Sequence, residues 1–390
     1  MEEYDRMEIQ HICSNICSGG TPKSTVEEYY GGIIPWLNTK EINFNRIYKT
    51  EKTITDEGLN NSSAKWIPAK SVIVAMYGAT AGKTAITQIP LTTNQACCNL
   101  TIDSTKADYR FVFYALCNDY AYLASLANGG AQQNLNAQQI REFEMPYPSL
   151  EEQECIADIL SSIDNKIDLN RRINDNLEQQ AQALFNYYFI DTPELLGEFS
   201  VGSLADAANY VNGLAMQKYR PINGEKGLPV LKIKELGQGR IDSSSDFCSN
   251  EIDSYYKVYD GDVIFSWSGT LMVKIWCGGK CGLNQHLFKV SSKTTPKWFY
   301  YFWTKHHLDN FIRIAKDKAV TMGHIKRGEL EKAEVLFPNN SVMKKLDTLM
   351  APFLDQIIEK ECEIRKLALL RDTLLPKLIS GELVINDINN

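Results

Sequence analysis

The sequence lacks an apolar run of the roughly 20 residues that a membrane-spanning helix needs, and no signal peptide opens it. It also lacks an excess of basic residues, because 41 Lys and Arg stand against 48 Asp and Glu, a formal net charge of −7. We therefore expect a cytoplasmic protein, and its total charge lacks the basic excess that is typical of nucleic-acid-binding proteins. A net charge averages over acidic helices, however, so local basic patches are not excluded.

Metal and catalytic patterns are missing as well. The pairs Cys13/Cys17 and Cys277/Cys281 are spaced four apart, without the two-residue gap of structural zinc sites, and His286 does not complete a set with Cys281. The ten cysteines have no small secreted framework around them, which favours reduced thiols. No triad pattern involves the five histidines, and no Asn/Asp-Pro-Pro-aromatic or S-adenosylmethionine loop is found. By elimination, the sequence indicates a binding protein that is not an enzyme.

The sequence has enough length and apolar content for several cores. At 390 residues, two or three domains are expected. A hydrophobic content of 44% with 10% aromatics argues against disorder.

Two long stretches, residues 150–189 and 342–378, have apolar residues at alternating steps of four and three, which predicts coiled-coil-like helices. Each would run for about 35 residues or about 50 Å, far beyond the usual helix of about 11–12 residues. Asn170 and Asn174 interrupt the first apolar stripe and could fix its register. The stripes are Ile156, Leu160, Ile163, Ile167, Asn170, Asn174, Leu177, Ala181 and Leu184, then Met350, Phe353, Ile357, Lys360, Ile364, Leu367, Arg371, Leu374 and Leu378.

The chain also contains an internal repeat. Four patches in the first part match four in the second in the same order, with offsets that fall slowly from 194 (228 − 34) to 188 (299 − 111). Such matches predict two diverged copies of one unit, each followed by a long helix. The matched patches are residues 34–42 with 228–236, 71–78 with 262–269, 93–95 with 283–285, and 111–114 with 299–302.

Each copy is predicted to be mixed α/β (α+β). The expected boundaries are residues 1–149 for a first α/β domain, 150–190 for a central long helix, 191–340 for a second α/β domain, and 341–390 for a C-terminal long helix and tail. Short apolar runs predict strands at 71–76, 85–89, 98–102, 261–266 and 286–290; aromatic-rich runs predict helices at 107–126 and 296–314; and polar clusters predict loops at 17–22, 56–63, 237–245 and 276–282.

Residues 78–84 (Gly-Ala-Thr-Ala-Gly-Lys-Thr) resemble a phosphate-binding loop that is one residue short. Residues 269–274, the matching segment of the second copy, lack the second glycine. A surface turn that brings Lys83 or Lys274 near a phosphate backbone is the favoured interpretation. A nucleotide-hydrolysing protein remains an alternative, as does a coiled-coil scaffold that binds no DNA.

Amides, hydroxyls and cations gather in several predicted loops of both copies, and such groups can contact base edges and phosphates. The candidate DNA-binding residues are Thr21, Lys23, Lys40, Thr80, Lys83, Asn94, Gln132, Gln133, Asn134, Lys218, Arg220, Lys232, Lys234, Thr270, Lys274, Asn284, Lys318, Thr321 and His324. No catalytic and no metal-binding residue is predicted.

The chain resembles the specificity subunits of type I restriction-modification systems over nearly its whole length. The resemblance rests on the duplicated order of block and helix, on the Pro-x-Leu-x-x-Lys-Glu patches at 35–41 and 229–235, on the turn at 78–83, on Gln-Gln-Asn-Leu at 132–135, and on the closing Leu-Leu-Pro-Lys-Leu-Ile-Ser-Gly at 374–381. The second copy departs from it, since its turn lacks the Gly-Lys ending and residues 322–325 (Met-Gly-His-Ile) replace the Gln-Gln-Asn pattern.

This resemblance implies a non-catalytic subunit that reads a split DNA target, one domain per half, with antiparallel helices as spacer. It also implies two docked adenine methyltransferase subunits and, in many members, two translocating nuclease subunits. No cofactor would bind this chain; the partners would use S-adenosylmethionine and, where a nuclease is present, ATP and Mg²⁺.

Overall fold

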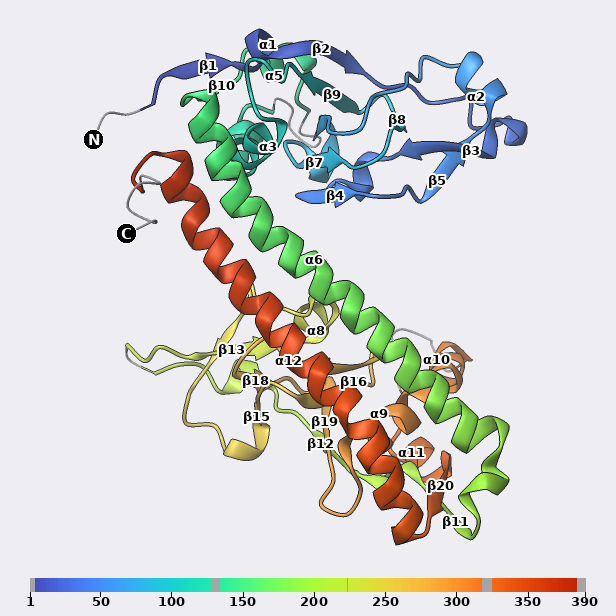
Figure 1. The fold of residues 1–390 in the computed structure, drawn as a ribbon. Coiled ribbons are helices and arrows are strands. Elements are labelled where there is room, and N and C mark those ends of the chain that lie inside the picture. The colour runs from blue at the N-terminus through green and yellow to red at the C-terminus, as the bar shows by residue number, and fades with distance from the viewer. Residues whose placement is uncertain (1–3, 128–133, 223, 318–324, 384–390) are drawn as a thin grey trace. The chain divides into compact units, whose positions relative to one another are not determined.

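The computed structural model describes residues 4–127, 134–222, 224–317 and 325–383 (Figure 1). Its contacts divide the chain into two units: the first unit is Met1–Asn165 with Leu369–Asn390, and the second unit is Lys166–Ala368. Both units are mixed α/β, as the sequence predicts. The finer division into recognition domains and spacer helices stays a prediction.

The first unit is built from short strands and helices that precede one long helix. Its strands are β1 (Arg6–Glu8), β2 (Cys13–Ser18), β3 (Tyr30–Leu37), β4 (Asn45–Ile47), β5 (Lys52–Ile54), β6 (Val72–Ala75), β7 (Thr84–Thr87), β8 (Thr92–Thr93), β9 (Cys97–Ile102) and β10 (Glu144–Pro146). Its short helices are α1 (Ile9–Ile12), α2 (Asp56–Asn60), α3 (Tyr109–Asn118), α4 (Tyr120–Ser125) and α5 (Ala137–Arg141).

The main sheet of the first unit has the order β2-β9-β6-β7-β4, and its central strands β6 and β7 are buried on both faces. Because side chains alternate along a strand, Val72 and Val74 of β6 pack with Phe111 of α3, whereas Ile73 and Ala75 pack with a second cluster that includes Leu37. A smaller sheet, β5-β3-β8, supplies that second layer, and β1 pairs with β10. The unit therefore has two apolar layers around one sheet.

The second unit repeats this plan. Its strands are β11 (Phe199–Ser203), β12 (Asn209–Asn212), β13 (Leu228–Leu231), β14 (Phe247–Cys248), β15 (Lys257–Val258), β16 (Asp262–Ser266), β17 (Met272–Trp276), β18 (Cys281–Leu283), β19 (Leu287–Ser291) and β20 (Glu334–Pro338). Its short helices are α7 (Leu204–Ala207), α8 (Ile233–Gln238), α9 (Lys297–His306), α10 (Leu308–Asp317) and α11 (Gly328–Lys332).

The two topologies confirm the repeat. The order β12-β19-β16-β17 matches β2-β9-β6-β7, all with antiparallel pairing, and β11 pairs with β20 as β1 pairs with β10. The parallel pair β13–β18 matches β3–β8. The copies differ at the edges, since β4 joins the main sheet of the first unit whereas β15 joins the smaller sheet of the second.

Several sequence predictions need correction. The loop expected at 56–63 begins with helix α2, because the Thr55 hydroxyl accepts from the Gly58 amide and caps it. The single helices expected at 107–126 and 296–314 are each two helices, and the breaks fall at Asp119 and His307. The loop expected at 17–22 starts inside β2.

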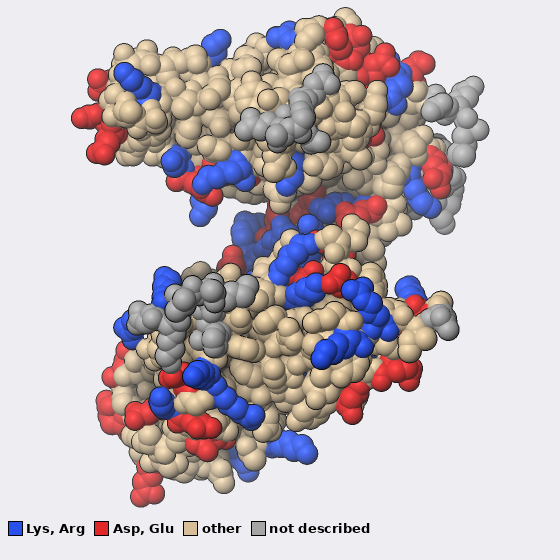
Figure 2. Space-filling model, turned by 180° about the vertical axis from the view of Figure 1, so that it is seen from behind, with Lys and Arg blue, Asp and Glu red and all other residues tan. Residues whose placement is uncertain are grey.

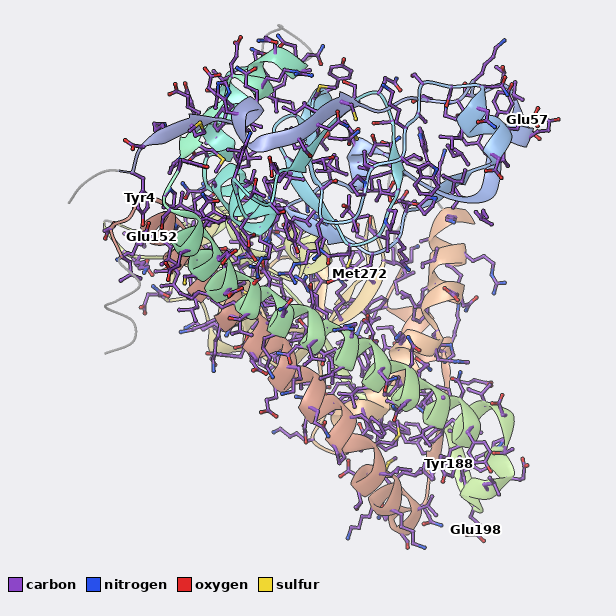
Figure 3. The ribbon with its side chains drawn as sticks, turned by 45° about the horizontal axis from the view of Figure 1, so that its top comes forward. Tyr4, Glu57, Glu152, Tyr188, Glu198 and Met272 are labelled. Carbon is purple, nitrogen blue, oxygen red and sulfur yellow. The ribbon has the colours of Figure 1, made fainter. Side chains whose placement is uncertain are left out.

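The two long helices are α6 (Leu150–Asn186) and α12 (Asn340–Ile379). Ser149 and Glu152 form a capping box at the start of α6, where the Glu152 carboxylate accepts from the Ser149 amide at 3.0 Å. Near this start, Tyr4 lies beside Glu152 (Figure 3), and burial together with the Glu152 charge raises the pKa of the Tyr4 hydroxyl.

The predicted apolar stripe of α6 is largely buried. Ile156, Leu160 and Ile163 lie inside the first unit, and Ala181 lies in the main core of the second. Within the second unit α6 and α12 run antiparallel, because Lys166 pairs with Glu363 while Asn174, farther along α6, donates to Glu361 at 2.8 Å.

In each unit, a buried tyrosine of the aromatic-rich helix also forms a hydrogen bond to a carboxylate of α6. In the first unit Tyr114 donates to Asp164 at 2.6 Å, and Arg371 of α12 pairs with the same carboxylate at 2.9 Å. In the second unit Tyr301 donates to Glu178 at 2.8 Å, and Lys305 pairs with that carboxylate at 2.6 Å. These two triads are called the helix anchors below.

Candidate nucleic-acid interface

The turn at residues 78–83 connects two antiparallel strands, β6 and β7. Gly78 and Gly82 have φ values of 69° and 82°, which side chains other than glycine rarely adopt. A phosphate-binding loop must lead into a helix whose amides face the phosphate, and here a strand follows. Lys83 donates instead to Asn43 at 2.8 Å. The geometry argues against nucleotide hydrolysis through this loop and supports the surface-turn interpretation.

The matching turn of the second unit connects β16 and β17 in the same way. Gly269 has a φ of 66°, close to that of Gly78. Thr270 is exposed on the turn, whereas Lys274 lies within β17 and donates to the Gly237 carbonyl at 2.8 Å. The two hairpins therefore share a positive-φ glycine three residues after the end of the first strand, but they differ in loop length and in side chains.

A second shared element is the turn that follows β8 and β18. Asn94 begins the turn in the first unit and Asn284 in the second, and each is 8% exposed. The Asn94 side-chain oxygen accepts from the Ala96 amide at 3.2 Å, and that of Asn284 accepts from the His286 amide at 3.3 Å. Both predicted site residues thus shape the turn from inside, and Gln95 and Gln285 occupy its corner. We call these the Asn-Gln turns.

In the first unit several predicted residues meet where β6 ends. The Ala96 carbonyl accepts from the Met76 amide at 2.8 Å, and the Met76 carbonyl accepts from the Leu135 amide at 2.8 Å. Tyr77, next to Met76, forms an isolated bridge with Asn134. Thr21 donates to Gln95. The end of β6 therefore gathers Thr21, Asn94, Thr80 and Asn134 from four separate segments.

The end of β16 has an equivalent arrangement. The Trp267 amide donates to the His286 carbonyl at 3.4 Å, and the Ile325 amide donates to the Trp267 carbonyl at 3.2 Å. The Trp267 indole donates to Asn212 at 3.0 Å. The sequence prediction missed five residues of these two regions: Tyr77, Trp267, Gln95, Gln285 and His286. The repeat could have revealed them, because its offset aligns each of them with a residue of the other copy.

The remaining predicted cations fall into two groups. Three are paired with carboxylates: Lys40 with Glu51 at 2.5 Å, Lys232 with Asp246, and Lys234 with Asp242 at 3.0 Å. Lys23, Lys218 and Arg220 are exposed. Gln132, Gln133, Lys318, Thr321 and His324 lie outside the described residues.

Two of these ion pairs lower the pKa of their carboxylates. The hydrogen bond from Lys232 lowers the pKa of Asp246, and the Ser244 hydroxyl with Lys234 lowers the pKa of Asp242 to about 2. Basic and acidic side chains are interspersed on the face drawn in Figure 2. Binding to a polyanion would therefore exchange existing ion pairs for new ones.

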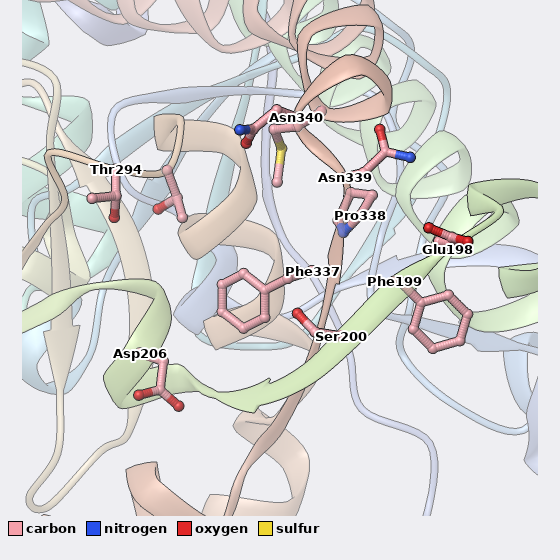
Figure 4. A pocket seen from close by; sticks show the side chains of 11 residues that line it. Glu198, Phe199, Ser200, Asp206, Thr294, Phe337, Pro338, Asn339 and Asn340 are labelled. Carbon is pink, nitrogen blue, oxygen red and sulfur yellow. The ribbon is translucent and has the colours of Figure 1, made fainter.

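A separate pocket of about 540 Å³ lies in the second unit, between β11, the end of β20 and the start of α12 (Figure 4). Two of its polar side chains bind the backbone: Asp206 accepts from the Ser203 amide at 2.8 Å, and Asn339 accepts from the Val342 amide at 3.0 Å. None of the predicted site residues lines it.

The described helices include none that combines the length and apolar character required to cross a membrane. All ten cysteines are free thiols. Across the described ranges, His, Cys, Asp and Glu form no group of three or more with the geometry to hold a metal ion.

Comparisons with known proteins identify relatives along the whole chain. A family model described as "Type I restriction modification DNA specificity domain" matches residues 1–179 and again residues 197–370. The chain is 28% identical to the type I restriction enzyme MjaIX specificity subunit of Methanocaldococcus jannaschii, over 99% of this chain and 95% of that protein. It is 24% identical to a putative type I specificity subunit of Mycoplasma pneumoniae, over 79% and 83% of the two chains.

Among solved structures, the crystal structure of a type I restriction-modification S subunit from M. genitalium superposes with a TM-score of 0.58. That alignment covers 96% of each chain at 16% identity, so it shows the fold alone.

Proposed function

Because this chain belongs to the family of type I restriction-modification DNA specificity proteins, we propose that it reads a bipartite DNA target, with one half-site for each unit. The observation that carries the proposal is the duplicated platform at the ends of β6 and β16. In both units a glycine hairpin turn and an Asn-Gln turn are hydrogen-bonded at one place and present polar groups outward. Base edges are read by such side chains held on a rigid backbone.

The long helices are proposed to act as the spacer between the two half-sites. α6 has 37 residues, or about 55 Å at 1.5 Å per residue. One duplex turn is about 34–36 Å long, so a helix of this length suits readers that contact grooves separated by unread base pairs.

Two adenine methyltransferase subunits are the proposed partners, and two nuclease subunits are added where such a gene accompanies them. The many exposed polar residues of α6 offer a docking face. S-adenosylmethionine, ATP and Mg²⁺ would belong to these partners, and this chain would supply recognition only.

The proposal is tested by expressing the chain with the methyltransferase subunit of its own system and mapping modified bases by long-read sequencing. The expected result is N6-methyladenine in one split motif, with no modification when either protein is expressed alone. Absence of a split motif in the co-expressing cells would contradict the proposal.

A four-residue deletion within residues 163–177 tests the spacer. Removal of about one helical turn is expected to change the number of unread base pairs while both half-sites keep their sequences. A substitution of the linker residues 192–199 that preserves their number serves as control. An unchanged spacing after the deletion would rule out the ruler role of the helix.

Exchange of the first unit's residues 1–149 for those of a relative tests the assignment of half-sites. One half of the methylated motif should change and the other should persist. A change in both halves would contradict one reader per half.

A further inference from the structure

The Asn-Gln turns have the same backbone in both units. The amide of Asn94 donates to the Leu37 carbonyl at 3.0 Å, and the amide of Asn284 donates to the Leu231 carbonyl at 3.1 Å. The carbonyl of each asparagine accepts from the amide three residues on, at 3.2 Å from Cys97 and at 3.0 Å from Leu287. These bonds define one β-turn with a glutamine at its first corner position.

A glycine packs against each turn. A Cβ atom on Gly19 would lie 2.4 Å from the Asn94 carbonyl oxygen, and one on Gly213 would lie 2.3 Å from that of Asn284. Such distances exclude any side chain at either glycine, so the turn is held between neighbouring backbones. The two turns are therefore supported in the same way, by close contact with a glycine backbone.

The two glutamines have different neighbours within the protein. Gln95 is exposed and accepts from Thr21, whereas the Gln285 amide lies 3.2 Å from the His286 ring. Neither bond occurs in the other unit, because Ala215 replaces Thr21 at the repeat offset of 194 (215 − 21) and Ala96 replaces His286 at 190 (286 − 96). Among the described residues, internal bonding therefore gives no common reason for glutamine at both corners.

The residues around the glutamines differ between the units. At the end of the central strand, Met76 and Tyr77 stand where the second unit has Trp267 and Ser268. Tyr77 is 44% exposed, and the Trp267 ring lies 6.1 Å from the His286 ring. Each platform thus combines the shared Asn-Gln turn with neighbouring side chains that differ between the units.

Contacts to the DNA backbone are independent of sequence, whereas contacts to base edges are not. We propose that Gln95 and Gln285 are paired contacts to the phosphate backbone that set the position of each half-site, and that the variable residues beside them discriminate bases. This inference rests on the proposed function. Each glutamine amide would donate one N–H group to a phosphate oxygen, and Tyr77 in the first unit and His286 in the second would face base edges.

The test uses the chain purified in complex with its methyltransferase subunits, a duplex that carries the methylated motif, and a duplex of scrambled sequence. Gln95→Ala and Gln285→Ala are each expected to weaken binding about 3- to 10-fold, equally on both duplexes, because a single hydrogen bond is lost. The methylated motif in cells should not change. Gln88→Ala, which removes a glutamine beyond the far end of β7, is the matched control and should bind as the wild type.

Gln95→Glu separates the backbone contact from base reading. A carboxylate beside a phosphate should weaken binding more than alanine does, and the difference should grow as the salt concentration is lowered. Tyr77→Ala and His286→Ala should instead relax one position of the motif, each in a different half.

Four results would overturn the inference: unchanged affinity in both alanine variants, a loss confined to the motif duplex, a changed base in the motif of Gln95→Glu, or loss of methyltransferase from the complex during gel filtration. The last would make the turn a protein contact. If the wild-type complex itself reads no split motif, the proposed function fails, and this inference falls with it.

Discussion

The helix anchors of the two units use the same chemistry with different connectivity. In the first unit the tyrosine, the carboxylate and the cation of the anchor (Tyr114, Asp164 and Arg371) come from three helices that are far apart in sequence. In the second unit Tyr301 and Lys305 come from one turn of α9, so that anchor involves only α9 and α6. The Asp164 side chain is 15% exposed and that of Glu178 is 39% exposed. The first anchor thus connects three helices instead of two, and its carboxylate is less exposed to water.

The largest expected difference comes from neutralising the anchor carboxylates. Asp164→Asn leaves Arg371 partly buried with a weaker partner and should lower the free energy of unfolding by about 2–3 kcal/mol. Glu178→Gln should cost about 1 kcal/mol or less, because water screens that pair. Urea unfolding with hydrogen exchange read separately for each unit measures both.

Asp372→Asn is the control for the first anchor, since Asp372 also pairs with Arg371 but is 61% exposed. Its effect should stay within about 0.5 kcal/mol. Equal losses in Asp164→Asn and Glu178→Gln would show that the two anchors do not differ in strength.

The stripe of α6 offers the next comparison, because it is apolar throughout the first unit and includes two buried asparagines in the second. Asn170 is fully buried near Glu363, without a hydrogen bond of good geometry to any described residue. Asn170→Leu should therefore raise the free energy of unfolding by about 1–2 kcal/mol, as loss of a poorly satisfied buried amide does.

The converse change, Ile163→Asn, places an amide at a stripe position that is 8% exposed in the first unit. It should lower the free energy of unfolding by at least the amount by which Asn170→Leu raises it. Thermal unfolding of the two variants compares them directly. A destabilised Asn170→Leu would mean that the amide contributes a favourable bond to the seam.

The matching glycines of the two hairpin turns should respond alike to substitution by alanine. Gly78→Ala and Gly269→Ala each force a side chain into positive φ and should cost about 1 kcal/mol apiece. Gly328→Ala is a useful control, because Gly328 begins α11 with negative φ and open space around it, so alanine should stabilise slightly. Unequal costs would mean that the two loops, which differ in length, do not constrain their glycines equally.

The smallest expected effect concerns pH. Burial, and then the neighbouring His307, lower the pKa of His306, and burial lowers that of His307 despite its bond to the Glu334 carbonyl. Below the ordinary value of 6.5 the unfolded chain therefore binds more protons than the folded one, and stability falls as the pH falls through this window. The first unit has Asn118 and Asp119 at these positions.

Hydrogen exchange at pH 7 and at pH 5.5, corrected for intrinsic rates, should show added opening around α9 and less around α3. His306→Asn should reduce the difference. The same acid response in both units would contradict the assignment to these histidines.

The repeat was predictable because burial on both faces of the central strand constrains both copies. Val72–Ala75 and Asp262–Ser266 must supply apolar residues to two layers, so their patterns survived divergence. Local polar signals were less informative. Asp, Gly and Asn at residues 56–63 suit a turn and a capped helix equally, and only the Thr55 bond decides between them.

The candidate interface was predictable by region but not by residue. Asn94 and Asn284 carry the right chemistry, yet the turn uses their side chains internally and the following glutamine occupies the corner. Lys232 is paired with Asp246, 14 residues farther along, which no local pattern reveals. Whether the predicted residues contact DNA stays a prediction.

The last residues of α12 determine when the first unit can complete its folding during translation. Leu378 and Ile379 pack with Ile156 and Leu160 in its core, yet the ribosome reaches position 379 only after 214 more residues (379 − 165) have followed the unit's first segment. At about 5–20 residues per second this delay is about 10–40 s. The second unit is continuous in sequence and is complete earlier. The part of the protein that is synthesised first is therefore the last to close its core, and it is the part most in need of protection during translation.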